Sequence, residues 1–198
     1  MAKGARGEQT RLEILQTALR LFALNGYFAT SMNDILEAVS LSKGAFYHHF
    51  KSKKDLALAV LEQLRGDYQQ EFIEPVRAEE PGRRVGEMLR LIVERNQSGE
   101  WFGCLLLSRL VAEMTQQEAE LAEQIVELVK GLIEFWREII SDDQTAGTIA
   151  EDIDPGVWAE TIFTAMGGAI AARELAQEMI HLEQIAEQLN MLIQRKTP

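Results

Sequence analysis

The sequence predicts an all-α chain, and three observations support that prediction. Apolar residues recur at spacings of three and four along most of the 198 residues, and no stretch alternates with period two long enough to indicate a strand. Polar residues suited to capping helix N-termini precede several of these segments. Apolar residues make up 46% of the chain, which is enough for a substantial core. We expect two domains, over residues 1–54 and 55–198.

The first helix is expected from about Gln9 to Leu24, because its apolar residues recur at helical spacing and Asn25-Gly26 ends it. The preceding segment, MAKGARG, is predicted to be a loose arm. Its Arg6, together with Arg11, either contacts phosphates or the minor groove, or has no such role.

Residues 30–50 predict two short helices joined by a tight turn. Ser31 is expected to cap the first helix by accepting the amide of Asp34, whose carboxylate favours the positive helix N-terminus. Ser42 is expected to cap the second helix, which runs from about Lys43 to Phe50.

A third cap follows at once and opens a longer helix. Ser52 stands three residues before Asp55, which is the spacing of a capping box. The helix is expected to continue through residue 73 and to be ended by Pro75 and then by Pro81-Gly82.

The helix over 43–50 divides into two faces at 100° per residue. Phe46 and Phe50 share one face. The other face is slim enough to enter a major groove about 12 Å wide. The long donors on this face and directly after the helix, Lys54 included, suit phosphate oxygens better than bases. We expect a DNA-binding surface formed by Ser31, Ser42, Lys43, Gly44, Ala45, Tyr47, His48, Lys51 and Lys53.

The charge of the chain is divided unevenly. Residues 1–54 hold eight Lys/Arg and four Asp/Glu, a net charge of +4. The whole chain carries −11, so residues 55–198 carry −15. A basic module on an acidic body suggests that one end binds a polyanion. The alternative is an ordinary lysine-bearing surface around a small helical core.

Residues 10–56 resemble the N-terminal DNA-binding domain of the TetR family of bacterial transcriptional regulators, and their run SKGAFYHHFKSKKDL is highly specific. The resemblance implies that 43–50 is a recognition helix, with Tyr47 and His48 at the DNA backbone or neighbouring bases and Phe46 and Phe50 packed inward. It further implies a homodimer on a double-stranded DNA operator and a helical effector-binding domain. A small molecule would release the DNA, and repression is the family's usual habit.

A dimer also has a physical motive, because one short recognition helix contacts too few base pairs. Two such helices, about 34–36 Å apart, match a palindrome. The competing interpretation is an effector-independent protein that organises DNA.

The remaining sequence predicts further helices, near 83–98, 101–114, 116–141, 155–177 and 181–194. Two starts are marked by caps, at Thr115 with Glu118 and at Asp154 before Pro155. The segment 141–154, SDDQTAGTIAEDID, is predicted to be an exposed loop.

The last two helices, 155–177 and 181–194, are by resemblance the ones that pair with the partner subunit. Small residues within 165–172 permit close helix approach. An apolar stripe follows on the final helix, formed by Leu182, Ile185, Leu189 and Leu192 or Ile193. The alternative is that this stripe belongs to the core of a single chain.

The helix over 101–114 is apolar around nearly its whole circumference, so we expect it in the middle of the body, where family members hold their ligand. Arg109 and Glu113 either form an internal ion pair or leave Arg109 to bind an anionic or carbonyl ligand. Cys104 is either an electrophile sensor or an inert buried thiol. The expected effector is apolar or electrophilic, and its candidate contacts are Trp101, Cys104, Ser108, Arg109 and Trp136.

Several classes of protein are not supported. The sequence has no Gly-rich phosphate loop, no HExxH and no CxxC, so we expect no enzyme activity, metal site or cofactor. One cysteine cannot make a disulfide scaffold. Neither an N-terminal apolar signal nor a run of roughly 18 apolar residues occurs, so we expect a cytoplasmic protein without membrane contact.

Overall fold

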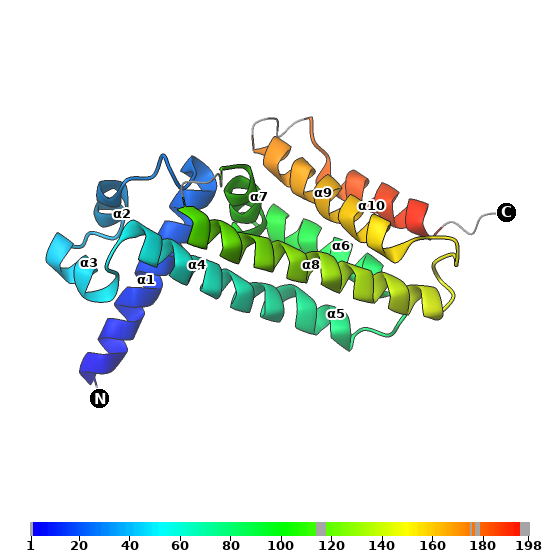
Figure 1. Cartoon of the computed structure of the whole chain (residues 1–198), viewed down its shortest axis with the longest axis horizontal. Helices are drawn as coiled ribbons and strands as arrows, with labels where there is room; N and C mark the ends of the chain where they lie inside the picture. The colour runs from blue at the N-terminus through cyan, green and yellow to red at the C-terminus, as the bar shows by residue number, and fades with distance from the viewer. Residues whose placement is uncertain (1, 114–117, 175, 177–178, 195–198) are drawn as a thin grey trace.

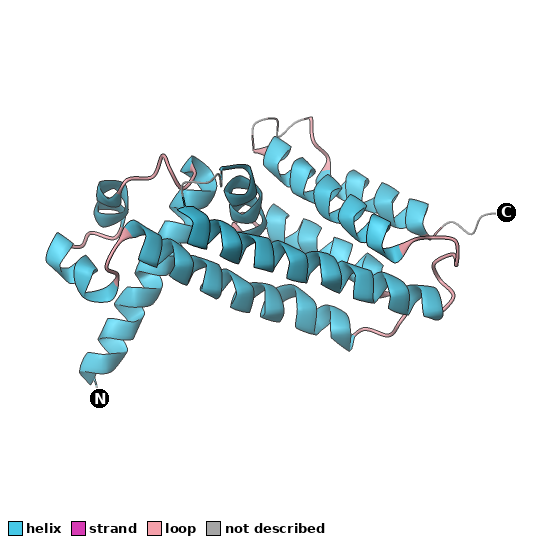
Figure 2. Cartoon of the chain, in the orientation of Figure 1, coloured by secondary structure: helices cyan, strands magenta, loops and turns pink. Residues whose placement is uncertain are grey.

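The computed structural model describes residues 2–113, 118–174, 176 and 179–194, with side chains from residue 7 onward. Within these ranges the chain is helical and forms no strand, as Figure 2 shows, so the predicted fold class is confirmed. The helices build an elongated molecule with the three N-terminal helices at one end (Figure 1).

The N-terminal end consists of α1 (Ala2–Asn25), α2 (Met32–Ala38) and α3 (Lys43–His49). Its core is made of apolar side chains at most 1% exposed, namely Ile14, Ala18, Phe22, Ile35, Phe46 and Phe50. The expectation of a loose arm before Gln9 is wrong, because α1 already begins at Ala2. Extending an existing helix costs little, and the Ala, Lys and Arg of this segment favour helix despite two glycines.

A continuous helical rod links this end to the body. It comprises α4 (Lys53–Tyr68), a π turn η1 (Gln69–Ile73) and α5 (Glu74–Ala78). The prediction that Pro75 ends the helix is therefore wrong. The N–H of Glu74 bonds to the carbonyl of Gln69, five residues back. The wider turn accommodates a proline that lacks an N–H and would otherwise crowd the preceding carbonyl.

The body is completed by α6 (Arg84–Gln97), α7 (Gly103–Glu113), α8 (Ala119–Thr145), α9 (Pro155–Arg173) and α10 (Leu182–Ile193). Helices α8 and α9 pack together, α10 packs on α6 and α9, and α7 lies between α1 and α9. Asp154 caps α9 as predicted, through the N–H groups of Gly156 and Val157. Thr115 lies outside the described residues, and Glu118 makes no capping hydrogen bond with its side chain.

The apolar stripe on α10 is divided between two environments. Leu182, Leu189 and Ile193 are buried within the single chain, whereas Leu192 is 45% exposed. For the three buried residues the intrachain alternative is the correct one.

The prediction of an exposed loop over 141–154 is wrong in its first part. Helix α8 continues to Thr145, and Asp143 is only 1% exposed. The Asp143 carboxylate accepts hydrogen bonds from the backbone N–H groups of Gly82 (2.6 Å), Val85 (2.9 Å) and Arg84 (3.3 Å). These donors precede or begin α6, and such groups have no partner within their own helix. A carboxylate far along the chain therefore fixes the α5–α6 turn.

Candidate nucleic-acid interface and ligand cavity

The short helices α2 and α3 are held at their starts by the predicted serine caps. Ser31 Oγ accepts from the N–H of Asp34 (3.2 Å), and the Asp34 carboxylate accepts from the N–H of Ser31 (2.7 Å), which completes a capping box. The hydrogen bond from the Ser31 N–H to the carboxylate, together with the Ser31 side chain, lowers the pKa of Asp34. Ser42 Oγ accepts from the N–H of Ala45 (3.3 Å). The starts of both helices of the pair are thereby fixed.

Helix α3 has one buried face and one exposed face. Phe46 and Phe50 lie in the core, and the Arg11 guanidinium stacks over the Phe50 ring at 5.0 Å. Tyr47 is 50% exposed, and a Cβ added at Gly44 would meet no atom within 4 Å. The exposed face of α3 is therefore slim, with its remaining predicted DNA contacts at Lys43, Ala45 and His48 also exposed.

The lysines that follow α3 differ in their environments. Lys51 is exposed, whereas the Lys53 ammonium lies 4.3 Å from the centre of the Tyr27 ring. Partial burial lowers the pKa of Lys53, and the nearby carboxylates of Glu113, Glu118 and Asp34 counteract this effect. Lys54 forms an ion pair with Glu120 of α8 at 2.6 Å. Two of the lysines predicted to contact phosphates are therefore already engaged within the protein, Lys53 by Tyr27 and Lys54 by Glu120 of the body.

The cap at the start of α4 departs from the expected capping box in one detail. Ser52 Oγ accepts from the N–H of Asp55 (3.0 Å), but the Asp55 carboxylate accepts from the N–H of Lys51 (2.8 Å). The carboxylate therefore fixes the backbone directly after α3.

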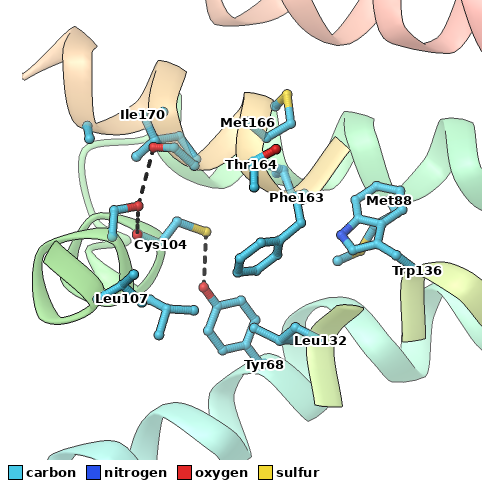
Figure 3. Close-up of a pocket in the computed structure, with 16 residues that line it drawn as sticks. Tyr68, Met88, Cys104, Leu107, Leu132, Trp136, Phe163, Thr164, Met166 and Ile170 are labelled. Carbon is cyan, nitrogen blue, oxygen red and sulfur yellow. Dashed lines mark hydrogen bonds between the residues drawn. The ribbon is translucent and has the colours of Figure 1, made fainter. Parts of the chain in front are cut away.

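An apolar cavity of about 290 Å³ lies inside the body, between α4, α6, α7, α8 and α9 (Figure 3). Its lining residues include Met88, Leu107, Leu132, Phe163 and Met166, and none of its lining side chains carries a formal charge at neutral pH.

Three polar side chains on the cavity wall, Tyr68, Cys104 and Ser108, make hydrogen bonds within the wall. Tyr68, which is buried, donates its hydroxyl to Cys104 Sγ at 3.4 Å (Figure 3). Burial raises the pKa of Tyr68 well above its ordinary value, so the hydroxyl stays neutral. Ser108 Oγ lies within hydrogen-bond distance of the carbonyls of Cys104 (3.0 Å) and Gly167 (3.3 Å). This bonding leaves a wall suited to an uncharged, mostly apolar ligand.

The structure places the predicted ligand residues in three different environments. Cys104, Ser108 and Trp136 line the cavity. Trp101 instead packs edge-on against Tyr68, with ring centroids 5.8 Å apart, and lines a neighbouring pocket. Arg109 lines neither of these two pockets.

Among the described residues Glu113 forms no ion pair with Arg109, so the alternative of an internal ion pair is wrong. Its carboxylate accepts hydrogen bonds from the backbone N–H groups of Tyr27 (2.8 Å) and Phe28 (3.3 Å). The end of α7 meets the loop after α1, where free amides attract a carboxylate. Spacing along one helix could not indicate this partner, nor that Tyr68 and Phe163 would meet in one cavity.

Two negative findings concern the described residues alone. No group of three or more His, Cys, Asp or Glu side chains among them is arranged to hold a metal ion. None of the helices within them combines the length and hydrophobicity needed to cross a membrane.

Comparison with known proteins gives two family matches that together cover most of the chain. The model for bacterial regulatory proteins of the tetR family matches residues 14–60. The model for the tetracyclin repressor-like C-terminal domain matches residues 84–189. The boundary predicted between residues 54 and 55 falls inside the first of these matches and within the first turn of α4.

Individual relatives extend over nearly the same length. The chain is 28% identical to the HTH-type transcriptional regulator UidR of Escherichia coli K12, over 86% of each protein. It is 24% identical to the HTH-type transcriptional repressor DhaR of Mycobacterium sp. GP1, over 88% of this chain and 87% of DhaR. The crystal structure of AibR in complex with isovaleryl coenzyme A and operator DNA shares the fold, with a TM-score of 0.74, 24% identity and coverage of 93% and 98%.

Proposed function

We propose, since the chain belongs to the TetR family of bacterial regulatory proteins, that this DNA-binding transcriptional regulator is a repressor that a small molecule releases from a palindromic operator. It is a regulator of this family and not an enzyme. One observation carries the proposal. The same chain holds an exposed, capped α3 and an apolar cavity, and α4 runs from the first to the second, beginning at Lys53 and ending at Tyr68.

In this proposal α3 enters the major groove of the operator. The exposed Tyr47, His48, Lys43 and Lys51 donate to phosphates, and the small Gly44 and Ala45 allow close approach. Ser31 and Ser42 lie at the starts of α2 and α3, where free backbone N–H groups also favour phosphate. Lys53 joins them only by leaving the Tyr27 ring. DhaR, which is named a repressor, supports the direction of control.

The proposed effector occupies the cavity beside Cys104, Ser108 and Trp136. A volume of about 290 Å³ and an uncharged wall suit a neutral, mostly apolar molecule. AibR, solved with isovaleryl coenzyme A and operator DNA, supports the proposal that a protein of this fold can bind both a small molecule and DNA. Because Cys104 lines this cavity, the second candidate effector is an electrophile that reacts with its thiol.

We further propose that the protein acts as a homodimer through α9 and α10. Apolar side chains remain exposed on or between these helices, at Val157, Met179, Met191 and Leu192. Exposed apolar surface of this kind is typical of interfaces. Two subunits would present two copies of α3 to the two halves of a palindrome.

The proposal is tested by titrating the protein into DNA from its own upstream region and into unrelated DNA of equal length, at roughly physiological salt. Sequence-independent binding typically gives dissociation constants of about 10⁻⁴ to 10⁻⁶ M under such conditions. We expect much tighter binding to the upstream fragment, and release when a matching apolar compound is added. Equal, weak binding to both fragments, with no operator obtained by selection from random DNA, would instead favour an effector-independent DNA-organising protein.

A further inference from the structure

The Glu113 carboxylate joins the body to the DNA-binding end through backbone atoms. It accepts hydrogen bonds from the backbone N–H groups of Tyr27 and Phe28, which are 86 and 85 positions away in the sequence. Gly26, directly before them, has φ +91°, and a Cβ at this position would overlap the Glu113 carboxylate. The loop is therefore shaped to admit this side chain.

The loop that Glu113 holds leads directly into α2. Thr30 is fully buried, and its Oγ1 lies 2.7 Å from the Gly26 carbonyl. Tyr27 is 3% exposed and packs edge-on against Phe22, with ring centroids 5.5 Å apart. Ser31 caps α2 one residue later. A shift of this loop must therefore move the start of α2, and with it the turn that carries α3.

The other part of α7 forms a wall of the cavity. Cys104, Leu107, Ser108 and Val111 all line it, and Val111 stands two residues before Glu113. Ser108 also lies 3.3 Å from the Gly167 carbonyl of α9. Helix α7 thus lines the cavity with these four residues, packs along α1, and bonds through Glu113 to the loop that follows α1. Such a helix moves as a unit when its packing changes.

We propose that Glu113 is a positioning residue for DNA binding, which transmits a displacement of α7 by a cavity occupant to α2 and α3. The inference rests on the ligand-responsive function proposed above, and it assigns the coupling to one side chain. An occupant that displaces α7 also displaces the Glu113 carboxylate from its two hydrogen bonds to Tyr27 and Phe28. The loop is then released, and α3 loses its fixed orientation.

The first test measures hydrogen exchange of the Tyr27 and Phe28 amides in the full chain. Glu113→Ala removes the acceptor, and we expect exchange at both amides to become at least about 10-fold faster. Glu113→Gln keeps a carbonyl oxygen at the same position and should restore much of the protection. Glu123→Ala removes the same charge from an exposed position on α8 and should change nothing at the loop. Unchanged exchange in Glu113→Ala would overturn the proposal.

The second test replaces the unidentified effector by a side chain. A Cβ at Gly167 would lie 3.7 Å from Ser108 Oγ, so Gly167→Leu fills the cavity against α7. We expect exchange at Tyr27 and Phe28 to rise about threefold or more in Gly167→Leu, with no further rise when Glu113→Ala is also present. Thr164→Leu is the second filling variant, to be used if Gly167→Leu does not fold.

Unchanged or slower exchange after filling, or an equal factor with and without Glu113, would overturn the coupling role. Neither measurement uses DNA or an effector. A failure of this inference is therefore distinct from a failure of the proposed function, which the DNA titration detects.

Discussion

At the scale of single residues, Phe46 and Tyr47 are neighbours with opposite environments. Phe46 is fully buried and packs with Phe50, whereas Tyr47 is half exposed on the outer face of α3. Their rings meet edge-on at 5.6 Å between centroids, so the core ring also orients the exposed one. The Tyr47 hydroxyl is thereby presented on a rigid support.

Tyr47→Ala is expected to weaken binding to every DNA sequence by roughly 2- to 10-fold, because the variant cannot make one hydrogen bond to a phosphate. Fluorescence anisotropy with an operator and an unrelated duplex measures this effect. The melting temperature should change little, since Tyr47 lies outside the core. Loss of preference at one base position, with overall affinity retained, would contradict the phosphate assignment.

Cys104 is the single thiol of the chain and faces the cavity beside Ser108. If it senses electrophiles, N-ethylmaleimide should release the wild-type protein from DNA and leave Cys104→Ser bound, because the adduct fills the cavity. The fraction of DNA bound is followed by anisotropy, and mass spectrometry checks for one adduct. Equal release of both proteins would exclude the sensor role and leave an inert buried thiol.

At the scale of elements, the turn between α5 and α6 depends on α8. Asp143 satisfies three backbone N–H groups around Gly82, and its neighbour Asp142 pairs with Arg84. The two carboxylates are adjacent in sequence, yet only Asp143 is buried. Substituting each in turn removes the same charge from a buried and from a partly exposed position, and so distinguishes the effect of burial from that of charge.

Asp143→Ala is expected to lower the free energy of unfolding by about 2–4 kcal/mol, because buried donors lose a charged acceptor. In a chain of this size each kcal/mol corresponds to roughly 2–4 °C in melting temperature. Asp142→Ala removes a partly exposed ion pair and should cost at most about 1 kcal/mol. Thermal denaturation followed by circular dichroism compares the two, and equal losses would refute the buried role of Asp143.

The elements that the sequence could predict are those determined locally. The caps at Ser31, Ser42 and Asp154 act on amides two or three residues away, and the structure contains all three. The partners of Asp143 and Glu113 are not predictable in the same way, because they are distant in sequence. The same holds for the cavity, since its walls come from five helices whose packing no local pattern specifies.

At the scale of the whole molecule, the charge is separated along its length. The +4 of residues 1–54 is carried by the end that includes α3, and the −15 of the remainder by the helical body. A polyanion is attracted to one end and repelled by the other. Association with DNA should therefore be strongly salt-dependent and restricted in orientation.

Lys51→Ala is expected to reduce the slope of log K against log salt, by about 0.9 for each phosphate that the protein no longer neutralises. A dimer carries two copies of this lysine, so the slope should fall by about 1.8. Lys130→Ala, on an exposed part of α8, is the matched control and should leave the slope unchanged. A fall of only about 0.9 would indicate one bound subunit per site.

The acidic body should also slow the approach of anions to the cavity. Several of the residues that line the cavity, such as Val111 and Thr164, are themselves exposed. A ligand that enters there approaches through the field of the negatively charged body. A dianion should therefore enter slowly at low ionic strength and faster as salt screens the field, whereas a neutral compound should enter at the same rate throughout. The acidic surface and the apolar cavity wall would then both disfavour anionic ligands.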